Sequence, residues 1–234
     1  MPVPPIIECP DNGFLLYKDE FSQDEVRRAT PLVASDTYQA MRSTDTQHYR
    51  SWWLRNEMGS NDPYALATTL LIASWETDDN PARKSRYQQA FVNAAAVLRP
   101  DGKEEEWFWI TLRAANALRE LGFFDAALSR LDELAEKTEL AGGKTDPSDL
   151  LDYISTLKLL VQASVTASEP TMLVPAEEAA FRCVVENAAL AAIERTACES
   201  ENVVAAISDT QITTEDGRAL TGEAAIRYMA KHWH

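Results

Sequence analysis

The stretch from Trp107 to Ala135 (WFWITLRAANALRELGFFDAALSRLDELA) constrains the fold more than any other part of the chain. Its first half is apolar over most of a helical circumference, which is typical of a helix buried on most sides. Gly122 then supplies the left-handed conformation that ends many helices. The second half is apolar along one stripe only. We therefore expect an inner helix, a tight turn and an outer helix, with Leu118 at the crossing of an αα-hairpin.

The small residues of this hairpin follow a spaced pattern. Ala114 and Ala115 precede the turn, Gly122 lies in it, and Phe124 and Ala127 follow it. In this pattern, residues 107–138 resemble one unit of a tetratricopeptide repeat, although the family's Tyr is replaced by Leu118 and its Ala by Leu134. The resemblance implies an array of helical hairpins that binds a peptide or protein in a groove lined by the first helix of each pair.

One line on the first helix combines polar groups with a large aromatic ring: Trp109, Arg113, Asn116 and Glu120, at positions i, i+4, i+7 and i+11. The resemblance places this line along the groove. Asn116 carries amide donors and an acceptor for the backbone of an extended peptide, and Arg113 can hold a carboxylate at two points. Trp109 offers an apolar platform. We predict that these four residues bind a partner; the alternative is that Asn116 and Arg113 face solvent or cap a loop.

Local signals predict where other helices begin. Asp62-Pro63, Asn80-Pro81 and Asp146-Pro147 each place a capping side chain before a Pro suited to the first helical position. A capping box at Ser22–Glu25 predicts a further helix that Pro31 ends. The helical pattern of residues 36–58 is expected to break near Ser43–Asp45. Pro175 is expected to open a last long helix that reaches Ala192.

Both ends of the chain carry short strand signals. Apolar runs at 6–9 and 14–17 flank the turn sequence Pro10-Asp11-Asn12-Gly13, which predicts a β-hairpin. Residues 203–207 and 211–214 favour strands, and Thr221 is expected to cap a terminal helix. The predicted fold is therefore mainly α, an irregular tetratricopeptide-like array of antiparallel hairpins with an N-terminal β-hairpin and a small C-terminal α+β appendage. The expected divisions are 1–59, 60–199 and 200–234.

The charge balance restricts the partners. With 22 basic and 37 acidic residues, the net charge is −15, which argues against nucleic acid or an anionic membrane surface as partner. Such acidity serves solubility; the alternative is that the partner protein or peptide is basic. No apolar run approaches a membrane span. The three cysteines are widely spaced, so we expect free thiols and a cytoplasmic location, with Cys183 and Cys198 buried along one helix.

No catalytic or metal-binding spacing stands out, and we expect neither a cofactor nor a metal. His232 and His234 lack fixed co-ligands, and His48 fits a core or interface position better than a general base. The leading hypothesis is a non-enzymatic interaction or scaffold protein. Two alternatives stay open: a subunit of a larger oligomeric assembly whose terminal arms pair with neighbours, and an enzyme with a site near His48.

Overall fold

The computed structural model describes residues 3–143 and 146–232, and the chain divides into two compact units, Met1–Leu150 and Leu151–His234. The boundary falls in the first turn of α8 (Pro147–Gln162), away from the divisions expected after residues 59 and 199. The described chain is mainly helical and carries a short antiparallel β-hairpin near each end, which confirms the predicted fold class. Each unit is described by itself.

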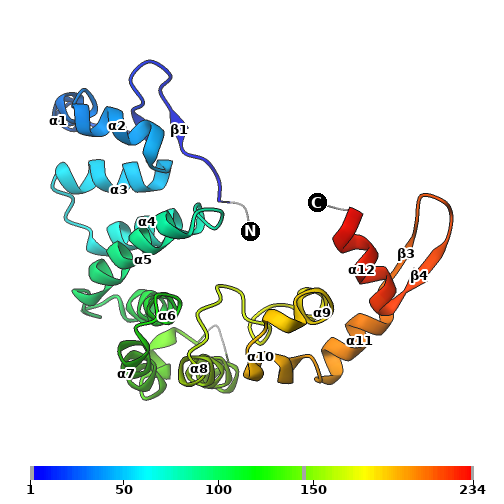
Figure 1. Ribbon diagram of the computed structural model, residues 1–234. Helices are drawn as coiled ribbons and strands as arrows, with labels where there is room; N and C mark the ends of the chain where they lie inside the picture. Colours follow the sequence, from blue (N-terminus) through cyan, green and yellow to red (C-terminus); the bar gives the residue numbers. More distant parts are fainter. Residues whose placement is uncertain (1–2, 144–145, 233–234) are drawn as a thin grey trace. The chain divides into compact units, whose positions relative to one another are not determined.

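The N-terminal unit is a β-hairpin followed by a succession of helices (Figure 1). From α3 to α7, each helix packs against the next one along the chain, as expected for helices joined by short turns. The elements are β1 (Ile7–Glu8), β2 (Leu15–Leu16), α1 (Gln23–Val33), α2 (Asp36–Thr44), α3 (Gln47–Glu57), α4 (Pro63–Trp75), α5 (Pro81–Ala96), α6 (Glu104–Glu120), α7 (Phe124–Ala135) and the 3-10 helix η1 (Thr138–Ala141).

The predicted helix starts are confirmed at atomic detail. Asp62 accepts a hydrogen bond from the N–H of Ala65 at 3.0 Å, and Pro63 begins α4. Asn80 does the same for Arg83 at the start of α5. Each cap satisfies a backbone N–H that has no partner within the helix. These starts therefore follow from local sequence alone.

The central hairpin of α6 and α7 is also confirmed. Gly122 has a φ of 80°, and its N–H donates to the carbonyl of Arg119. The N–H of Phe123 donates to the carbonyl of Leu118 at 2.8 Å, so α6 ends in a Schellman motif. Leu118 is 5% exposed, as expected at a helix crossing.

The N-terminal β-hairpin is held against the helices by polar contacts. Both amino groups of Arg50, on α3, donate to the carboxylate of Glu8, at 3.1 and 2.6 Å. The hydroxyl of Tyr38, on α2, donates to the carbonyl of Gly13 at 2.7 Å. Leu15 is fully buried beneath these contacts. Because an isolated two-stranded hairpin is marginally stable, docking of this kind is what fixes the segment.

The prediction for Pro31 is wrong. Pro31 lies inside α1, which continues to Val33. In the last turn of a short helix, the missing N–H removes one intrahelical hydrogen bond, and burial of Val33 at 3% exposure favours continuation. The predicted break near Asp45 is confirmed, because Asp45 is the extended residue after α2.

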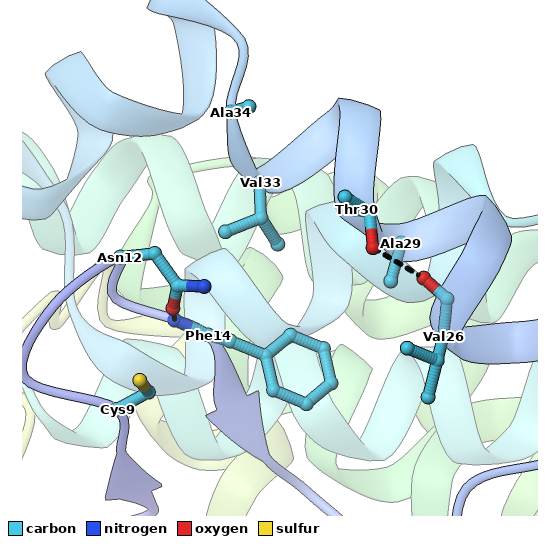
Figure 2. A pocket seen from close by; sticks show the side chains of 8 residues that line it. All are labelled: Cys9, Asn12, Phe14, Val26, Ala29, Thr30, Val33 and Ala34. Atoms are coloured by element: carbon cyan, nitrogen blue, oxygen red, sulfur yellow. Dashed lines mark hydrogen bonds between the residues drawn. The ribbon is translucent and has the colours of Figure 1, made fainter.

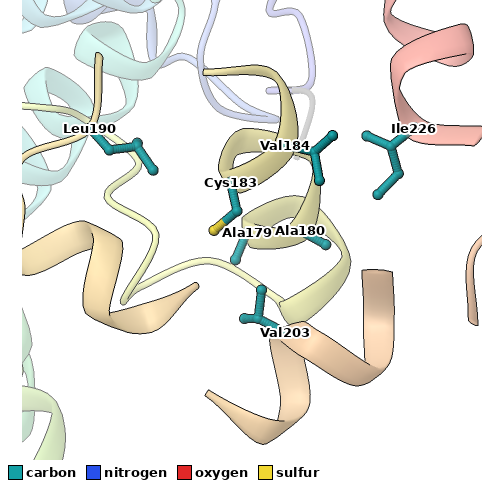
Figure 3. Close-up of a cluster of buried hydrophobic side chains, with 7 residues drawn as sticks. All are labelled: Ala179, Ala180, Cys183, Val184, Leu190, Val203 and Ile226. Carbon is teal, nitrogen blue, oxygen red and sulfur yellow. The ribbon is translucent and has the colours of Figure 1, made fainter. Parts of the chain in front are cut away.

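The core of the C-terminal unit is built mainly from the helices α9, α11 and α12 (Figure 3). Ala179, Ala180 and Val184 of α9 face Val203 of α11 and Ile226 of α12. The elements after α8 are α9 (Ala176–Val185), the 3-10 helix η2 (Asn187–Ala189), α10 (Ala192–Ala197), α11 (Glu201–Asp209), β3 (Gln211–Thr213), β4 (Ala219–Thr221) and α12 (Gly222–His232).

Three predictions for this unit are wrong. Residues 203–207 form part of helix α11, because Val203 and Ile207 share one helical face that packs toward α9. The expected long helix from Pro175 ends at Val185. The chain then reverses, and Cys183 and Cys198 form a disulfide with Cα atoms 5.6 Å apart, rather than lying as free thiols along one helix. The strand at Gln211–Thr213 and the helix after Thr221 are confirmed.

Candidate functional site

The structure places the predicted line of Trp109, Arg113, Asn116 and Glu120 along α6, but with different environments. Arg113 is exposed. Trp109 is partly buried, and its indole N–H donates to the carbonyl of Ala141 in η1 at 3.3 Å. Trp109 thus helps to fix the segment after α7, and its indole N–H is already used in a hydrogen bond within the protein.

Asn116 and Glu120 belong to a polar network that joins α6 to α5. The amide of Asn116 donates to Glu120 at 2.8 Å and accepts from Arg119 at 3.0 Å. Gln88 of α5 donates to the other carboxylate oxygen of Glu120 at 2.7 Å, and the Lys84 amino group lies 3.5 Å from it. The amide groups predicted to hold a peptide are therefore engaged within the protein, and their role toward a partner stays a prediction.

A pocket of about 380 Å³ lies on another side of the same hairpin. We call it the α5–α7 pocket. It combines an apolar wall with several charged groups, and its lining comprises Ala95, Ala96, Leu98, Arg99, Pro100, Trp107, Thr111, Arg130, Glu133, Lys137 and Leu140. The Lys137 amino group lies 5.2 Å from the centre of the Trp107 ring and 2.6 Å from Glu133. Trp107 itself is 7% exposed, so its ring forms part of the buried wall of the pocket.

Arg130 is the unusual member of this pocket. Its side chain is partly buried, yet it makes no hydrogen bond and no ion pair with any residue of 3–143 or 146–232. Burial lowers the pKa of the Arg130 guanidinium, and the charge of Glu133 opposes this only in part. Cations removed from water are ordinarily paired, because losing hydration is costly. A guanidinium with five free donors is suited to a carboxylate or another oxyanion.

The sequence does not predict Arg130 as a site residue, because an arginine in a sequence does not show whether its side chain will be buried or paired. It is the only basic residue on α7, where Asp125, Asp132 and Glu133 surround it in sequence. A single basic residue on an otherwise acidic helix is the sequence feature that could have drawn attention to Arg130. Which carboxylates come within reach depends on how α5, α6 and α7 pack.

A second pocket, of about 270 Å³, lies between the N-terminal β-hairpin and α1 (Figure 2). It is mainly apolar. Phe14 and Cys9 face it from the hairpin, and Val26, Ala29 and Val33 face it from α1. Cys9 is the free cysteine and is partly exposed. The pocket offers room for an apolar group but few polar contacts to orient one.

His48 has a structural partner. Its Nδ1 lies 2.7 Å from a carboxylate oxygen of Glu76, whose other oxygen accepts from the backbone N–H of His48. Burial alone would raise the pKa of Glu76, but the hydrogen bonds from His48 and Thr46 lower it. Glu76 thus caps the start of α3. His48 is 9% exposed and lines neither pocket described above.

Within the described residues, no group of three or more His, Cys, Asp or Glu side chains is arranged to hold a metal ion. Over that same part of the chain, every helix is too short or too polar to cross a membrane. No protein-family model matches the chain, and no curated protein or solved structure is significantly similar to it.

Proposed function

We propose that the protein is a non-enzymatic interaction protein, whose N-terminal helical unit holds a segment of a partner protein with the α5–α7 pocket as anchor. The observation that carries this proposal is Arg130, a partly buried cation without a partner among the described residues. In this pocket, Arg130 would pair with an acidic side chain of the partner, and the apolar wall would contact a neighbouring apolar side chain.

The apolar wall lies beside the charge. Leu98, Trp107 and Leu140 line the same recess as Arg130. Binding sites of this kind combine apolar contact area with a small number of polar groups that fix orientation. Arg and Trp are also the residues most often found to dominate binding energy at protein interfaces.

The remainder of the partner segment is expected to be basic. A net charge of −15 attracts basic sequences at long range and speeds their association. Arg130 then selects, at short range, a segment that also carries one acidic anchor. The predicted line of Trp109, Arg113, Asn116 and Glu120 on α6 remains a candidate for further contacts.

The test compares Arg130→Gln with wild type in quantitative affinity capture from the native cell, followed by anisotropy titration of a peptide from the captured partner. The matched control is Arg227→Gln, which removes an exposed guanidinium from the C-terminal unit. We expect Arg130→Gln to weaken binding about tenfold or more, as expected for loss of a charged hydrogen bond. The control should bind as wild type does.

Thermal stability separates binding from structure. Because Arg130 makes no hydrogen bond or ion pair with the described residues, Arg130→Gln should melt at the wild-type temperature or slightly above it. Unchanged partner binding by the variant, or a clear fall in its melting temperature, would contradict the proposal. Replacing the acidic residue of the peptide by its amide should have the same effect as Arg130→Gln.

The assembly alternative is favoured by one observation on the β-hairpin. Ile7 and Leu16 are a cross-strand pair, and they remain 71% and 47% exposed. Two apolar side chains side by side on an outer face are a common feature of interfaces. Light scattering after size-exclusion chromatography tests this: Ile7→Lys should convert an oligomer to a monomer if the pair lies in a subunit contact, and a monomeric wild type would rule it out.

A further inference from the structure

A third pocket of the N-terminal unit concentrates positive charge, although the chain as a whole is strongly acidic. We call it the α1–α3 pocket. It has a volume of about 420 Å³ and is lined by Tyr17, Lys18, Glu25, Arg28, Arg55, Met58, Gly59, Ser60 and Asn61. Three cations and one carboxylate face the same recess. Gly59, with a φ of 71°, allows the chain to turn after α3 and bring Ser60 and Asn61 to its rim.

Two of the three cations already have a carboxylate partner. The Lys18 amino group lies 2.5 Å from Glu25. Arg28 lies 3.1 Å from Asp24, a carboxylate that it shares with Arg27, and also donates to the carbonyl of Met58 at 2.8 Å. Neither side chain can take a second anion without sharing the first.

Arg55 is different. It donates to the hydroxyl of Thr69 at 2.9 Å, a neutral acceptor, and no carboxylate of the described residues lies within ion-pair distance of it. On its other side, Arg55 lines a recess with Asp62 and Glu106, but both of those carboxylates lie within 4 Å of Lys103. Arg55 is therefore the cation of this pocket that has no carboxylate within ion-pair distance among the described residues.

Tyr17 adds an oriented surface and a donor. The Arg55 guanidinium lies 5.5 Å from the centre of the Tyr17 ring, a cation–π contact that restricts its plane. The Tyr17 hydroxyl donates only to the sulfur of Met58, at 3.8 Å, and a thioether is a weak acceptor. Burial raises the pKa of Tyr17, so the phenol keeps its proton at neutral pH. A ligand oxygen would be a better acceptor for this hydroxyl.

We propose that the α1–α3 pocket is a binding site for a small polar organic acid, with its single carboxylate on Arg55 and its hydroxyl groups near Tyr17, Ser60 and Asn61. One carboxylate matches the one cation of the pocket that has no carboxylate partner among the described residues, and it suits the two-point geometry of a guanidinium. A dianionic phosphate would have to displace Glu25 or Asp24 from their cations. This site is separate from the α5–α7 pocket and does not depend on the function proposed above.

The experiment is calorimetric titration of the full-length protein with glycerate, a three-carbon hydroxy acid. Two further arms use glyceramide, in which the carboxylate is a neutral amide, and inorganic phosphate. We expect saturable binding of glycerate, no detectable binding of glyceramide, and phosphate binding weaker than that of glycerate. Absence of glycerate binding, or tighter binding of phosphate, would overturn the proposal.

Variants locate the binding. Arg55→Gln keeps a donor for Thr69 and should weaken glycerate about tenfold or more, while Arg55→Lys keeps the charge and should lose less. Tyr17→Phe should weaken binding a few-fold. Arg130→Gln is the control and should bind glycerate normally. Melting curves of each variant verify folding, and wild-type affinity in a folded Arg55→Gln variant would place the ligand elsewhere and contradict the assignment.

Discussion

The ring of Tyr49 on α3 stacks on the ring of Tyr87 on α5, with centroids 4.1 Å apart and an interplanar angle of 8°. The guanidinium of Arg86 lies 5.0 Å from the centre of each ring and forms an ion pair with Asp45. Asp45 is the extended residue that follows α2. One cluster therefore joins three helices, at the point where the chain turns from α2 into α3.

Tyr87→Phe should destabilise the N-terminal unit. The Tyr87 hydroxyl donates to Asp45 at 2.7 Å and accepts from the N–H of Thr46 at 3.2 Å. Removing it leaves two partly buried polar groups with fewer partners, at a cost of about 1–3 kcal/mol. Thermal melts should show a fall of several degrees. The control is Tyr153→Phe, because the Tyr153 hydroxyl makes no hydrogen bond within the described residues; an equal loss in both variants would contradict the assignment.

Leu118→Asp should be far more severe. Leu118 is 5% exposed at the α6–α7 crossing, and a charge placed there has no partner. An uncompensated buried charge costs about 3–5 kcal/mol, which is a large share of a typical domain stability of about 5–15 kcal/mol. Urea unfolding followed by circular dichroism measures the loss. Val26→Asp, at a position 48% exposed, should be nearly neutral; similar midpoints for the two variants would show that the crossing is misassigned.

The Glu8–Arg50 ion pair predicts a pH dependence. The paired hydrogen bonds from Arg50 lower the pKa of Glu8 from its ordinary 4.5, although burial opposes this. A lowered pKa in the folded state contributes stability that is complete above the unfolded value and is lost as pH falls toward the folded one. The stability difference between wild type and Glu8→Gln should therefore be largest near neutral pH and shrink below about pH 4.5.

Urea midpoints at neutral pH and near pH 3 measure this difference. Glu57→Gln, which alters an exposed carboxylate on α3, serves as control and should leave the pH profile unchanged. A constant difference between wild type and Glu8→Gln across this range would show that Arg50 does not hold the carboxylate in solution.

Thiol counting tests the cysteine assignment. Cys9 is free, whereas Cys183 and Cys198 are joined. In denaturant without reductant, one thiol per chain should react with maleimide, and reduction should expose two more. Opening a loop of 15 residues costs about 3 kcal/mol in the chain-entropy account, so Cys198→Ser should melt earlier than wild type. Three reactive thiols before reduction would contradict the disulfide and would agree with the free thiols expected from the sequence.

The features that sequence predicted are those whose cause is local. A capping Asp62 or Asn80 acts on an N–H three residues away, and Gly122 needs only its own backbone freedom. The features it missed depend on distant packing. Val203 favours a strand by its β-branched side chain, but its contact with α9 decides for helix. The disulfide needs a reversal between Val185 and Ala192, which no single residue announces.

The candidate sites show the same division. Sequence identified α6 as the central helix, and Asn116 does carry a polar network there. The sequence could not identify Arg130 or Arg55. What distinguishes these two residues is that no carboxylate of the described residues lies within ion-pair distance of either guanidinium. A count of charges gives the net balance of the chain. Only the fold gives the pairing of each charge.

The docking of the β-hairpin also limits how the protein can associate. Arg50 is 3% exposed and depends on Glu8 for its counter-charge. If the segment of residues 6–16 left its own helices to join a second molecule, a buried guanidinium would lose that partner until an identical segment replaced it. Exchange of this arm between copies would therefore need to be reciprocal. Association through the exposed pair of Ile7 and Leu16 requires no such exchange, because a second molecule can pack on these side chains while the hairpin stays docked on its own helices.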